Sequence, residues 1–245
     1  MAKLTNKIAL VTGGGSGIGA ASANALLQEG AKVAIAGRDL KKLDEVAKSL
    51  GNPANLITVQ ADVSDQKQVV MLVATVTKKL GGSIDILVNN AGTNLKQRAF
   101  REITPEGWDR LIRTNLDGAF YCIHAVAPAM IERKDGVIIN IVSTSGKRAG
   151  PLGGVAYSAS KFGMAALGLC VGAEEKDNGL RVCNIFPGEV DTPILQFRPN
   201  AITEEHRQRM LQPQDVAEAV RFVAMQPKHV SIPELIIKPV SQMYV

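Results

Sequence analysis

The chain has 245 residues, of which 46% are hydrophobic and 21% charged, with a formal net charge of +5. This apolar fraction excludes an intrinsically disordered chain, and a small positive excess without a run of five Lys or Arg is not a nucleic-acid signature. The length suits one α/β domain over residues 1–245, with neither repeat nor linker.

Short runs rich in Val and Ile alternate with longer amphipathic stretches along the chain. The predicted strands are Ile8–Thr12, Lys32–Ala36, Leu56–Gln60, Asp85–Val88, Val137–Val142, Arg181–Phe186 and Glu234–Lys238. The predicted helices are Gly17–Glu29, Leu40–Leu50, Gln66–Leu80, Glu106–Glu132, Val155–Asp177 and Pro213–Met225. This alternation predicts a Rossmann-type, doubly wound α/β domain, a seven-stranded parallel sheet with helices on both faces.

The first predicted strand leads into glycines in the segment Ile8–Ala20, IALVTGGGSGIGA. Glycine allows a positive φ and a close backbone approach, and the following helix start offers free N–H groups to a pyrophosphate. The segment therefore predicts a dinucleotide site, and the lack of a Lys after the last glycine argues against a P-loop.

The apolar stretch in the first 15 residues is too short for a signal peptide or a membrane span, so we expect a cytoplasmic protein away from membranes.

The second predicted strand ends in AIAGRD, Ala34–Asp39, where an acid selects NAD and a base selects NADP. Arg38 can hold a 2′-phosphate through two N–H donors. Asp39 can be interpreted as the NAD-selecting acid or as the cap of the next helix, and we favour the cap. The sequence favours NADP(H) over NAD(H), although Ser16 stands where a second basic residue would strengthen the case.

Tyr157 and Lys161, in YSASK, are four residues apart and so share one face of a predicted helix. A nearby ammonium lowers the pKa of a phenol, so the pair is suited to proton transfer near neutral pH. Ser143 ends the preceding strand, at the sheet edge where ligands bind, and can hold a substrate oxygen, a role for which Thr144 and Ser145 compete. The three cysteines form no CxxC pair, and no metal site is predicted.

The motifs TGGGSGIG, NNAG, YSASK and PG, with Asn115 and Ser143 between them, occur in an order that resembles the short-chain dehydrogenase/reductase family over residues 7–225. The resemblance implies that Asn115, Ser143, Tyr157 and Lys161 are catalytic. In this family the matching Asn bends its helix and holds a water in a proton relay to the lysine. The stretch Ile232–Val245 lacks the family's frequent glycine-containing ending, and it resembles the serine dehydrogenase and clavaldehyde reductase branches.

The resemblance also implies a set of cofactor contacts, in which the acid after the third strand meets the adenine and the PG region meets the nicotinamide carboxamide. The residues are Gly13, Gly15, Ser16, Gly17, Ile18, Gly19, Arg38, Asp62, Val63, Asn89, Ala91, Gly92, Tyr157, Lys161, Pro187, Gly188, Val190 and Thr192. Asp62 has a second interpretation, as a cap at the end of the third strand.

The function predicted is NADP(H)-dependent hydride transfer between nicotinamide and a carbonyl or secondary alcohol. One alternative is a 3-oxoacyl-carrier reductase, with Arg133 and Lys134 attracting an acidic carrier protein. Another is a cofactor-sensing or scaffold protein without catalysis. The weakly patterned stretch 189–212 is the expected substrate lid, and a homo-oligomer, dimer or tetramer, is the expected assembly.

Overall fold

The computed structural model describes residues 2–243 and contains a parallel sheet in the order β3-β2-β1-β4-β5-β6-β7. The predicted α/β Rossmann-type fold with seven parallel strands is therefore confirmed. The strands are β1 (Ile8–Thr12), β2 (Lys32–Gly37), β3 (Leu56–Gln60), β4 (Ile86–Asn89), β5 (Gly136–Ile141), β6 (Leu180–Pro187) and β7 (Glu234–Ile237).

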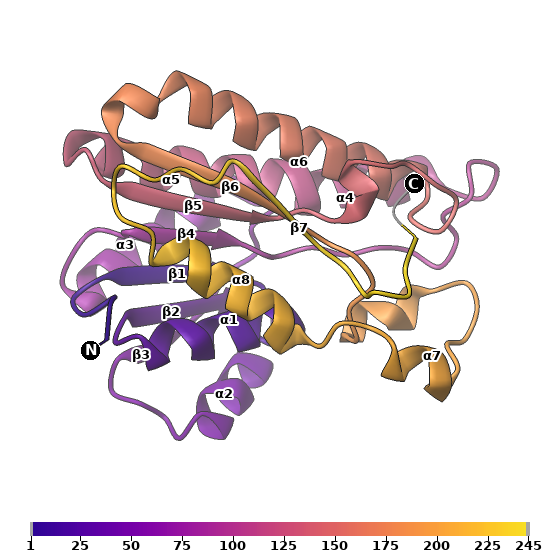
Figure 1. Ribbon diagram of the computed structural model, residues 1–245, viewed down its shortest axis with the longest axis horizontal. Coiled ribbons are helices and arrows are strands. Elements are labelled where there is room, and N and C mark those ends of the chain that lie inside the picture. The colour runs from indigo at the N-terminus through magenta and orange to yellow at the C-terminus, as the bar shows by residue number, and fades with distance from the viewer. Residues whose placement is uncertain (1, 244–245) are drawn as a thin grey trace.

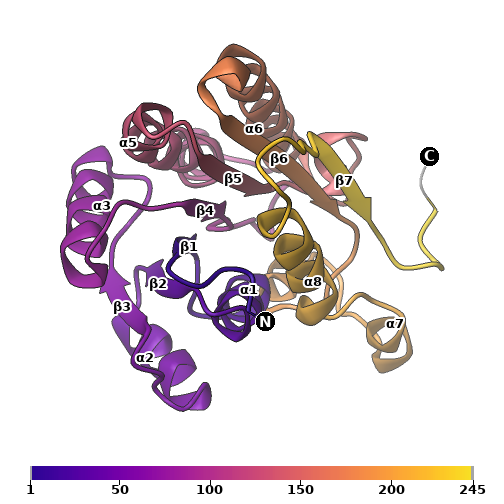
Figure 2. The same ribbon diagram turned by 60° about the vertical axis from the view of Figure 1, so that its left-hand side comes forward.

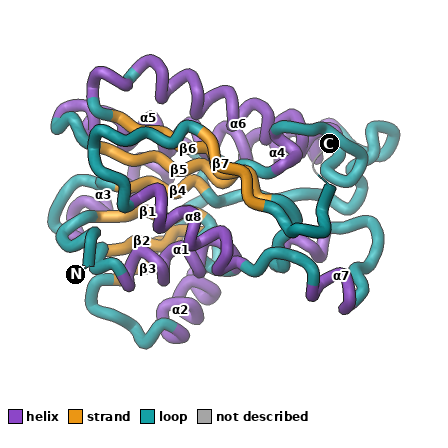
Figure 3. Tube along the Cα trace, viewed as in Figure 1, coloured by secondary structure: helices purple, strands orange, loops and turns teal. Residues whose placement is uncertain are grey.

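Helices cover both faces of the sheet (Figures 1 and 2). On one face lie α1 (Gly17–Gln28), α2 (Leu40–Ser49) and α8 (Pro213–Ala224). On the other lie α3 (Gln66–Leu80), α4 (Pro105–Ile112), α5 (Gly118–Glu132) and α6 (Val155–Glu174). Figure 3 shows the strands enclosed between these layers, as parallel sheets require, and each face packs its own apolar core.

The helix predicted at Glu106–Glu132 is interrupted in the structure. Between α4 and α5 runs a π-helical turn, Arg113–Asp117, with Asn115 at its centre. An extra residue in a helical turn changes the direction of the side chains that follow. The periodic pattern of apolar residues continues across this turn and does not mark the break, but the turn lies at Asn115, where the family resemblance implies a bend.

The sequence pattern of the segment after β6 predicts no regular element, but the segment contains two short helices. These are the 3₁₀ helix η4 (Pro193–Phe197) and α7 (Glu204–Gln208), which Thr203 caps by accepting a hydrogen bond from the His206 amide. In Figure 1, α7 lies beyond the carboxyl ends of the strands. The predicted helix Val155–Asp177 ends earlier, at Glu174, and the 3₁₀ turn η3 (Lys176–Asn178) follows it.

Three buried asparagines cross the centre of the sheet at one level. Asn89 pairs in register with Asn140, and Asn140 with Asn184. The Asn89 amide donates to Asn140 at 3.0 Å, Asn140 donates to Asn184 at 2.9 Å, and Asn184 donates to the Ala165 carbonyl of α6 at 2.9 Å. Gly168 lets α6 approach this row, because a Cβ there would lie 2.2 Å from the Asn184 Oδ1.

α6 is also long and apolar enough to cross a membrane by composition alone, and among residues 2–243 it is the one such helix. It packs along β6 and the 3₁₀ turn η2 (Thr144–Gly146), so it is a core helix of the domain.

An ionic network closes the amino-terminal edge of the sheet. Asp135, whose side chain is 9% exposed, contacts Lys7 at 2.9 Å, Lys228 at 3.2 Å and Arg181 at 3.3 Å. Asp85 contacts Lys7 at 3.1 Å and accepts a hydrogen bond from the Ile8 amide at 2.8 Å. Burial tends to raise the pKa of Asp135, but the hydrogen bonds from Lys7 and Lys228 outweigh it and hold the pKa below its ordinary value.

We expect Asp135→Asn to lower the free energy of unfolding by about 1–3 kcal/mol at pH 7. A carboxyl whose folded-state pKa is depressed stabilises the fold above its unfolded-state pKa, and this stabilisation is lost as pH falls through the folded-state value. The deficit should therefore shrink below about pH 4 in urea titrations of both proteins. Exposed Glu132→Gln is the matched control. A deficit that stays constant down to pH 3 would contradict the prediction.

Candidate active site

A cleft of about 440 Å³ opens at the carboxyl edge of the sheet. It is bordered by the glycine turn after β1, the loops after β4 and β5, the start of α6, and the segment that follows β6. Loops at this edge of an open parallel sheet are the usual place for a ligand. The cleft therefore lies where the sequence places the cofactor and the catalytic side chains.

The glycine turn is shaped by contacts that leave no room for side chains. Gly13 and Gly17 have φ angles of +65° and +51°, a conformation that glycine adopts without strain. A Cβ on Gly19 would lie 2.3 Å from the Gly13 carbonyl oxygen. The turn is thus a tight backbone cradle that ends at the amino terminus of α1, which suits a pyrophosphate.

The end of β2 presents basic side chains to the cleft. Arg38 and Lys42 both line it, whereas Asp39 does not. The Asp39 side chain accepts a hydrogen bond from the Lys42 amide at 3.3 Å, so it caps α2 as predicted. Among the described residues that line this end of the cleft there are two cations and no carboxylate, a set that suits a phosphate on the adenosine ribose of a cofactor.

Tyr157 and Ser143 both line the cleft. Tyr157 lies on the first turn of α6 and Ser143 follows β5. Burial raises the pKa of Tyr157, while a hydrogen bond with Ser143 and the positive charge of Arg98 act to lower it. Of the three candidates Ser143, Thr144 and Ser145, all of which line the cleft, Ser143 is the one that acts on the pKa of Tyr157.

Lys161 lies one turn further along α6 and is 3% exposed. Its Nζ donates to the Ile141 carbonyl at 2.8 Å and lies 5.8 Å from the centre of the Tyr157 ring. Burial lowers the pKa of Lys161 to about 7. The positive charge of Arg98, a residue that the sequence did not single out, also acts to lower the pKa of Tyr157, and the effect of Lys161 on the phenol stays a prediction.

Asn115 is fully buried in the π-helical turn. Its Oδ1 accepts from the Thr93 amide at 2.8 Å, and its Nδ2 donates to the Thr93 carbonyl and to the Ser160 Oγ, both at 3.1 Å. A methyl group on Gly92 would lie 3.4 Å from the Asn115 Oδ1 and 3.7 Å from the Lys161 Nζ. Asn115 therefore joins the loop after β4 to α6 and lies close to Lys161.

The structure brings most of the predicted residues together around the cleft. Those that line it are Gly13, Ser16, Gly17, Ile18, Arg38, Gly92, Ser143, Tyr157, Lys161, Pro187, Gly188, Val190 and Thr192. Those outside its lining are Gly15, Gly19, Asp62, Val63, Asn89, Ala91 and Asn115. Asp62 accepts hydrogen bonds from the Ser64 amide and hydroxyl, as expected for a cap at the end of the third strand. Asn89 belongs to the buried asparagine row.

Some lining residues were missed from the sequence. Lys42 lies in the first turn of α2, four residues after Arg38, and its charge so close to the end of β2 is the signal that could have found it. Arg98, Glu189 and Gln242 come from irregular segments without a pattern. Gln242 lies in the carboxyl-terminal stretch, and its Oε1 accepts from the Glu189 amide at 2.9 Å, so this stretch reaches the cleft of its own chain.

The segment 189–212 is fastened at the cleft by ionic contacts. Glu189 accepts hydrogen bonds from Arg198 at 2.7 Å and His206 at 2.6 Å, and Arg207 pairs with Asp191. Burial tends to raise the pKa of Glu189, but the bonds from Arg198 and His206 outweigh it and lower the pKa.

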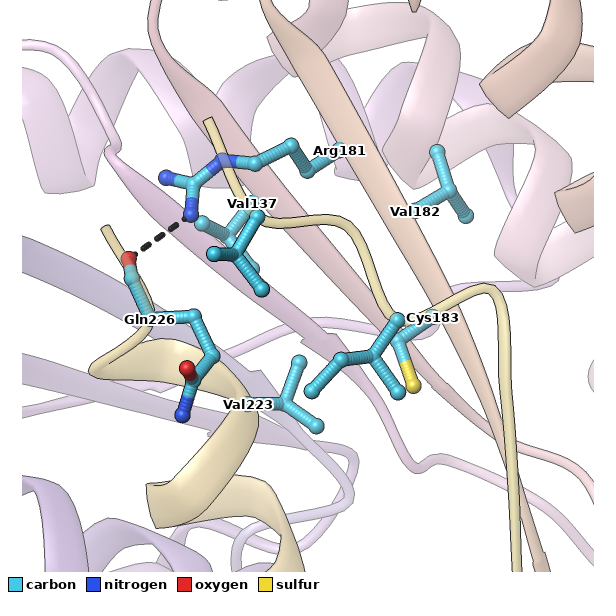
Figure 4. A pocket seen from close by; sticks show the side chains of 8 residues that line it. Val137, Arg181, Val182, Cys183, Val223 and Gln226 are labelled. Carbon is cyan, nitrogen blue, oxygen red and sulfur yellow. Dashed lines mark hydrogen bonds between the residues drawn. The ribbon is translucent and has the colours of Figure 1, made fainter. Parts of the chain in front are cut away.

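A second crevice lies between α8 and the amino-terminal part of β6 (Figure 4). Its lining includes Val137, Cys183, Val223 and Arg181, whose Nη1 donates to the Gln226 carbonyl at 2.9 Å. It has room for about one water molecule, so it offers no ligand site.

Comparisons with known proteins agree with this geometry. The family model described as short chain dehydrogenase matches residues 7–202. An uncharacterised oxidoreductase of Staphylococcus saprophyticus is 39% identical over 242 residues, covering 98% of this chain and all of that protein. The chain belongs to the short-chain dehydrogenase/reductase family.

Two solved structures illustrate the likeness. A closed form of serine dehydrogenase complexed with NADP+ matches with a TM-score of 0.88 and 34% identity, covering 97% of this chain and 96% of that one. A 3-ketoacyl-(acyl-carrier-protein) reductase from Brucella melitensis complexed with NADH matches with a TM-score of 0.87 and 29% identity, covering 96% and 98%. This chain is thus an oxidoreductase of a family that uses NAD(P).

Proposed function

We propose that this protein is an NADP(H)-dependent oxidoreductase that interconverts a carbonyl group and a secondary alcohol. The observation that carries the proposal is the joint lining of one cleft by Ser143, Tyr157 and Lys161 and by the basic pair Arg38 and Lys42. The first group suits proton transfer to a carbonyl oxygen, and the second suits a ribose phosphate.

In this proposal the bound cofactor supplies a hydride to the carbonyl carbon. Tyr157 gives its phenolic proton to the oxygen, and Ser143 donates a hydrogen bond to the same oxygen as negative charge develops. Lys161 binds the nicotinamide ribose and Asn115 supports the proton path to it. The segment 189–212 excludes water as a lid.

The carrier-protein alternative gains no support from Arg133. Its guanidinium donates to the Asp135 carbonyl at 2.7 Å and lies 3.8 Å from Asp85, at the amino-terminal edge of the sheet, opposite the cleft.

The alternative of a cofactor sensor without catalysis is tested by following NADPH absorbance over a panel of carbonyl compounds and by measuring NADPH binding by calorimetry. Binding of NADPH without turnover on any compound would favour the sensor.

Cofactor selectivity tests the role of the basic pair. We expect Arg38→Gln to lower the ratio of kcat/KM for NADPH to that for NADH by at least about tenfold, because a charge-assisted bond to the 2′-phosphate is lost while NADH offers none. Lys41→Gln, an exposed neighbour outside the cleft, should leave the ratio unchanged. An unchanged ratio in Arg38→Gln would remove the basis for NADP selection.

We also propose that the chain forms a homo-oligomer through α5 and α6, which lie side by side in Figure 2. Phe120 on α5 and Leu169 on α6 are 46% and 44% exposed. Burying such side chains in an interface contributes about 1.5–3 kcal/mol each, so the double variant Phe120→Glu/Leu169→Glu should elute as a monomer in light-scattering chromatography. Val70→Glu, exposed on α3, is the control. A wild-type monomer would contradict the proposal.

A further inference from the structure

Arg98 is an almost fully buried cation at the end of the cleft that is formed by the proposed lid, residues 189–212; we call this the lid end of the cleft. It lies in the loop between β4 and α4, is 6% exposed and lines the cleft. Its guanidinium donates to the carbonyls of Leu95 and Leu152, both at 2.7 Å, and to that of Phe197. Arginine has five N–H donors, so within residues 2–243 one N–H on each terminal nitrogen is left without an assigned acceptor.

The position of Arg98 is fixed from behind by the backbone. Gly154, which precedes α6, has a φ of +82°, and a Cβ there would lie 2.7 Å from the Arg98 Cβ and 2.8 Å from its carbonyl oxygen. This close packing holds the arginine stem against the first turn of the helix that carries Tyr157. The guanidinium is therefore held in place and close enough for its charge to act on the Tyr157 phenol.

Within residues 2–243, no carboxylate forms an ion pair with Arg98. Among the described residues that line the cleft, Glu189 is the one acid, and its oxygens already accept from Arg198 and His206. Arg198 itself stands near Arg98: burial is the larger cause that lowers the pKa of Arg98, and the charge of Arg198 is the second. The lid end of the cleft therefore holds two guanidiniums and one carboxylate.

A buried cation is costly unless an anion or several hydrogen bonds compensate it. Neutral carbonyls satisfy three of the Arg98 donors but leave its net charge in place. Arg38 follows β2 and Lys42 lies in the first turn of α2, so a cofactor phosphate proposed to bind this pair does not neutralise Arg98. An anion on the substrate would supply both the missing charge and acceptors for the remaining N–H groups.

We propose that Arg98 binds an anionic oxygen group of the substrate, a carboxylate or a phosphate, at the lid end of the cleft. The substrates are then carbonyl compounds, or the matching alcohols, that carry such a group. The inference rests on the proposed function and narrows its substrate class. The anion takes no part in bond making: the carbonyl carbon gains the hydride and its oxygen gains the Tyr157 proton.

The test compares matched charged and neutral substrates with NADPH. Short oxo acids are paired with their methyl esters, and dihydroxyacetone phosphate is paired with dihydroxyacetone. We expect wild type to prefer the charged member of at least one pair by about tenfold or more in kcat/KM, and Arg98→Gln to lower that ratio by at least about tenfold, mainly through KM. Arg98→Lys, which keeps the charge, should retain part of the preference.

The ratio of kcat/KM for the charged substrate to that for its neutral partner distinguishes anion recognition by Arg98 from a merely structural role. If Arg98 only fastens the loops at Leu152 and Phe197, its loss lowers activity on both members of a pair and leaves the ratio unchanged, which overturns the inference. Wild type that prefers the neutral members also overturns it while the proposed oxidoreductase function stands. Arg101→Gln removes an exposed arginine of the same loop and should change nothing.

Calorimetry gives a readout without turnover. Butanoate should bind the protein saturated with NADP+ more tightly than butanamide does, and Arg98→Gln should abolish the difference. If no carbonyl compound is reduced, the oxidoreductase proposal fails. The difference in affinity between butanoate and butanamide then shows by itself whether Arg98 binds an anion. Equal binding of butanoate and butanamide to wild type would overturn the site.

Discussion

Tyr157→Phe should lower kcat for NADPH-dependent carbonyl reduction by at least about a thousandfold and leave the dissociation constant of NADPH within about threefold of wild type. The hydroxyl is the one part of the side chain that is lost, and the ring still packs at the start of α6. Burial raises the pKa of this phenol, so in the cofactor-free protein it is protonated at neutral pH and ready to act as an acid.

The measurement is a steady-state rate from NADPH absorbance, with binding followed by calorimetry. Tyr121→Phe removes a phenolic hydroxyl from α5, away from the cleft lining, and is the matched control. Retention of most activity in Tyr157→Phe would mean that another group protonates the substrate. Loss of NADPH binding in parallel would mean that the hydroxyl shapes the cofactor site instead.

Lys161→Met should give a protein that is inactive but more stable without cofactor, by on the order of 3 kcal/mol at pH 7. The folded-state pKa of Lys161, about 7, lies below the ordinary value of 10.5, so the fold disfavours the charged amine. This destabilisation is complete below pH 7 and disappears as pH rises through the unfolded-state pKa. Loss of the bond to the Ile141 carbonyl offsets about 1 kcal/mol of the gain.

Urea titrations at pH 7 and pH 10 test this expectation. The stability difference between Lys161→Met and wild type should be largest near neutrality and small at pH 10, while exposed Lys78→Met should show no such trend. A variant less stable than wild type at both pH values would show that the amine contributes favourable contacts larger than its burial cost. A buried amine retained at this cost is typical of functional sites.

The order of strands and helices could be predicted from the sequence because each strand is a short apolar run bounded by turn residues or helix caps. Asp39 and Asp65 cap α2 and α3 by accepting amide hydrogen bonds, as their positions indicate. The catalytic candidates could be placed because Ser143 ends a strand and YSASK begins a helix, so both features map to the same sheet edge.

Other features depend on tertiary contacts that no local pattern reports. The π-helical turn forms where Asn115 bonds the Thr93 backbone, 22 residues away. Arg98 is buried because Leu152 and Phe197 supply carbonyls from distant loops. The burial of Lys161, which lowers the pKa of its amine to about 7, likewise follows from packing that the spacing of YSASK does not report.

The buried asparagine row fixes the relative positions of two loops that line the cleft. Ser143 and Pro187 each stand three residues beyond a member of the row, Asn140 and Asn184, which face one another in adjacent strands. Sliding one strand by one residue would shift these loops by about 3.3 Å and turn the amides toward the opposite apolar layer without partners. The Asn184 amide also donates to the Ala165 carbonyl of α6, the helix that carries Tyr157. The register of the strands therefore sets the position of Ser143 and the position of α6 together.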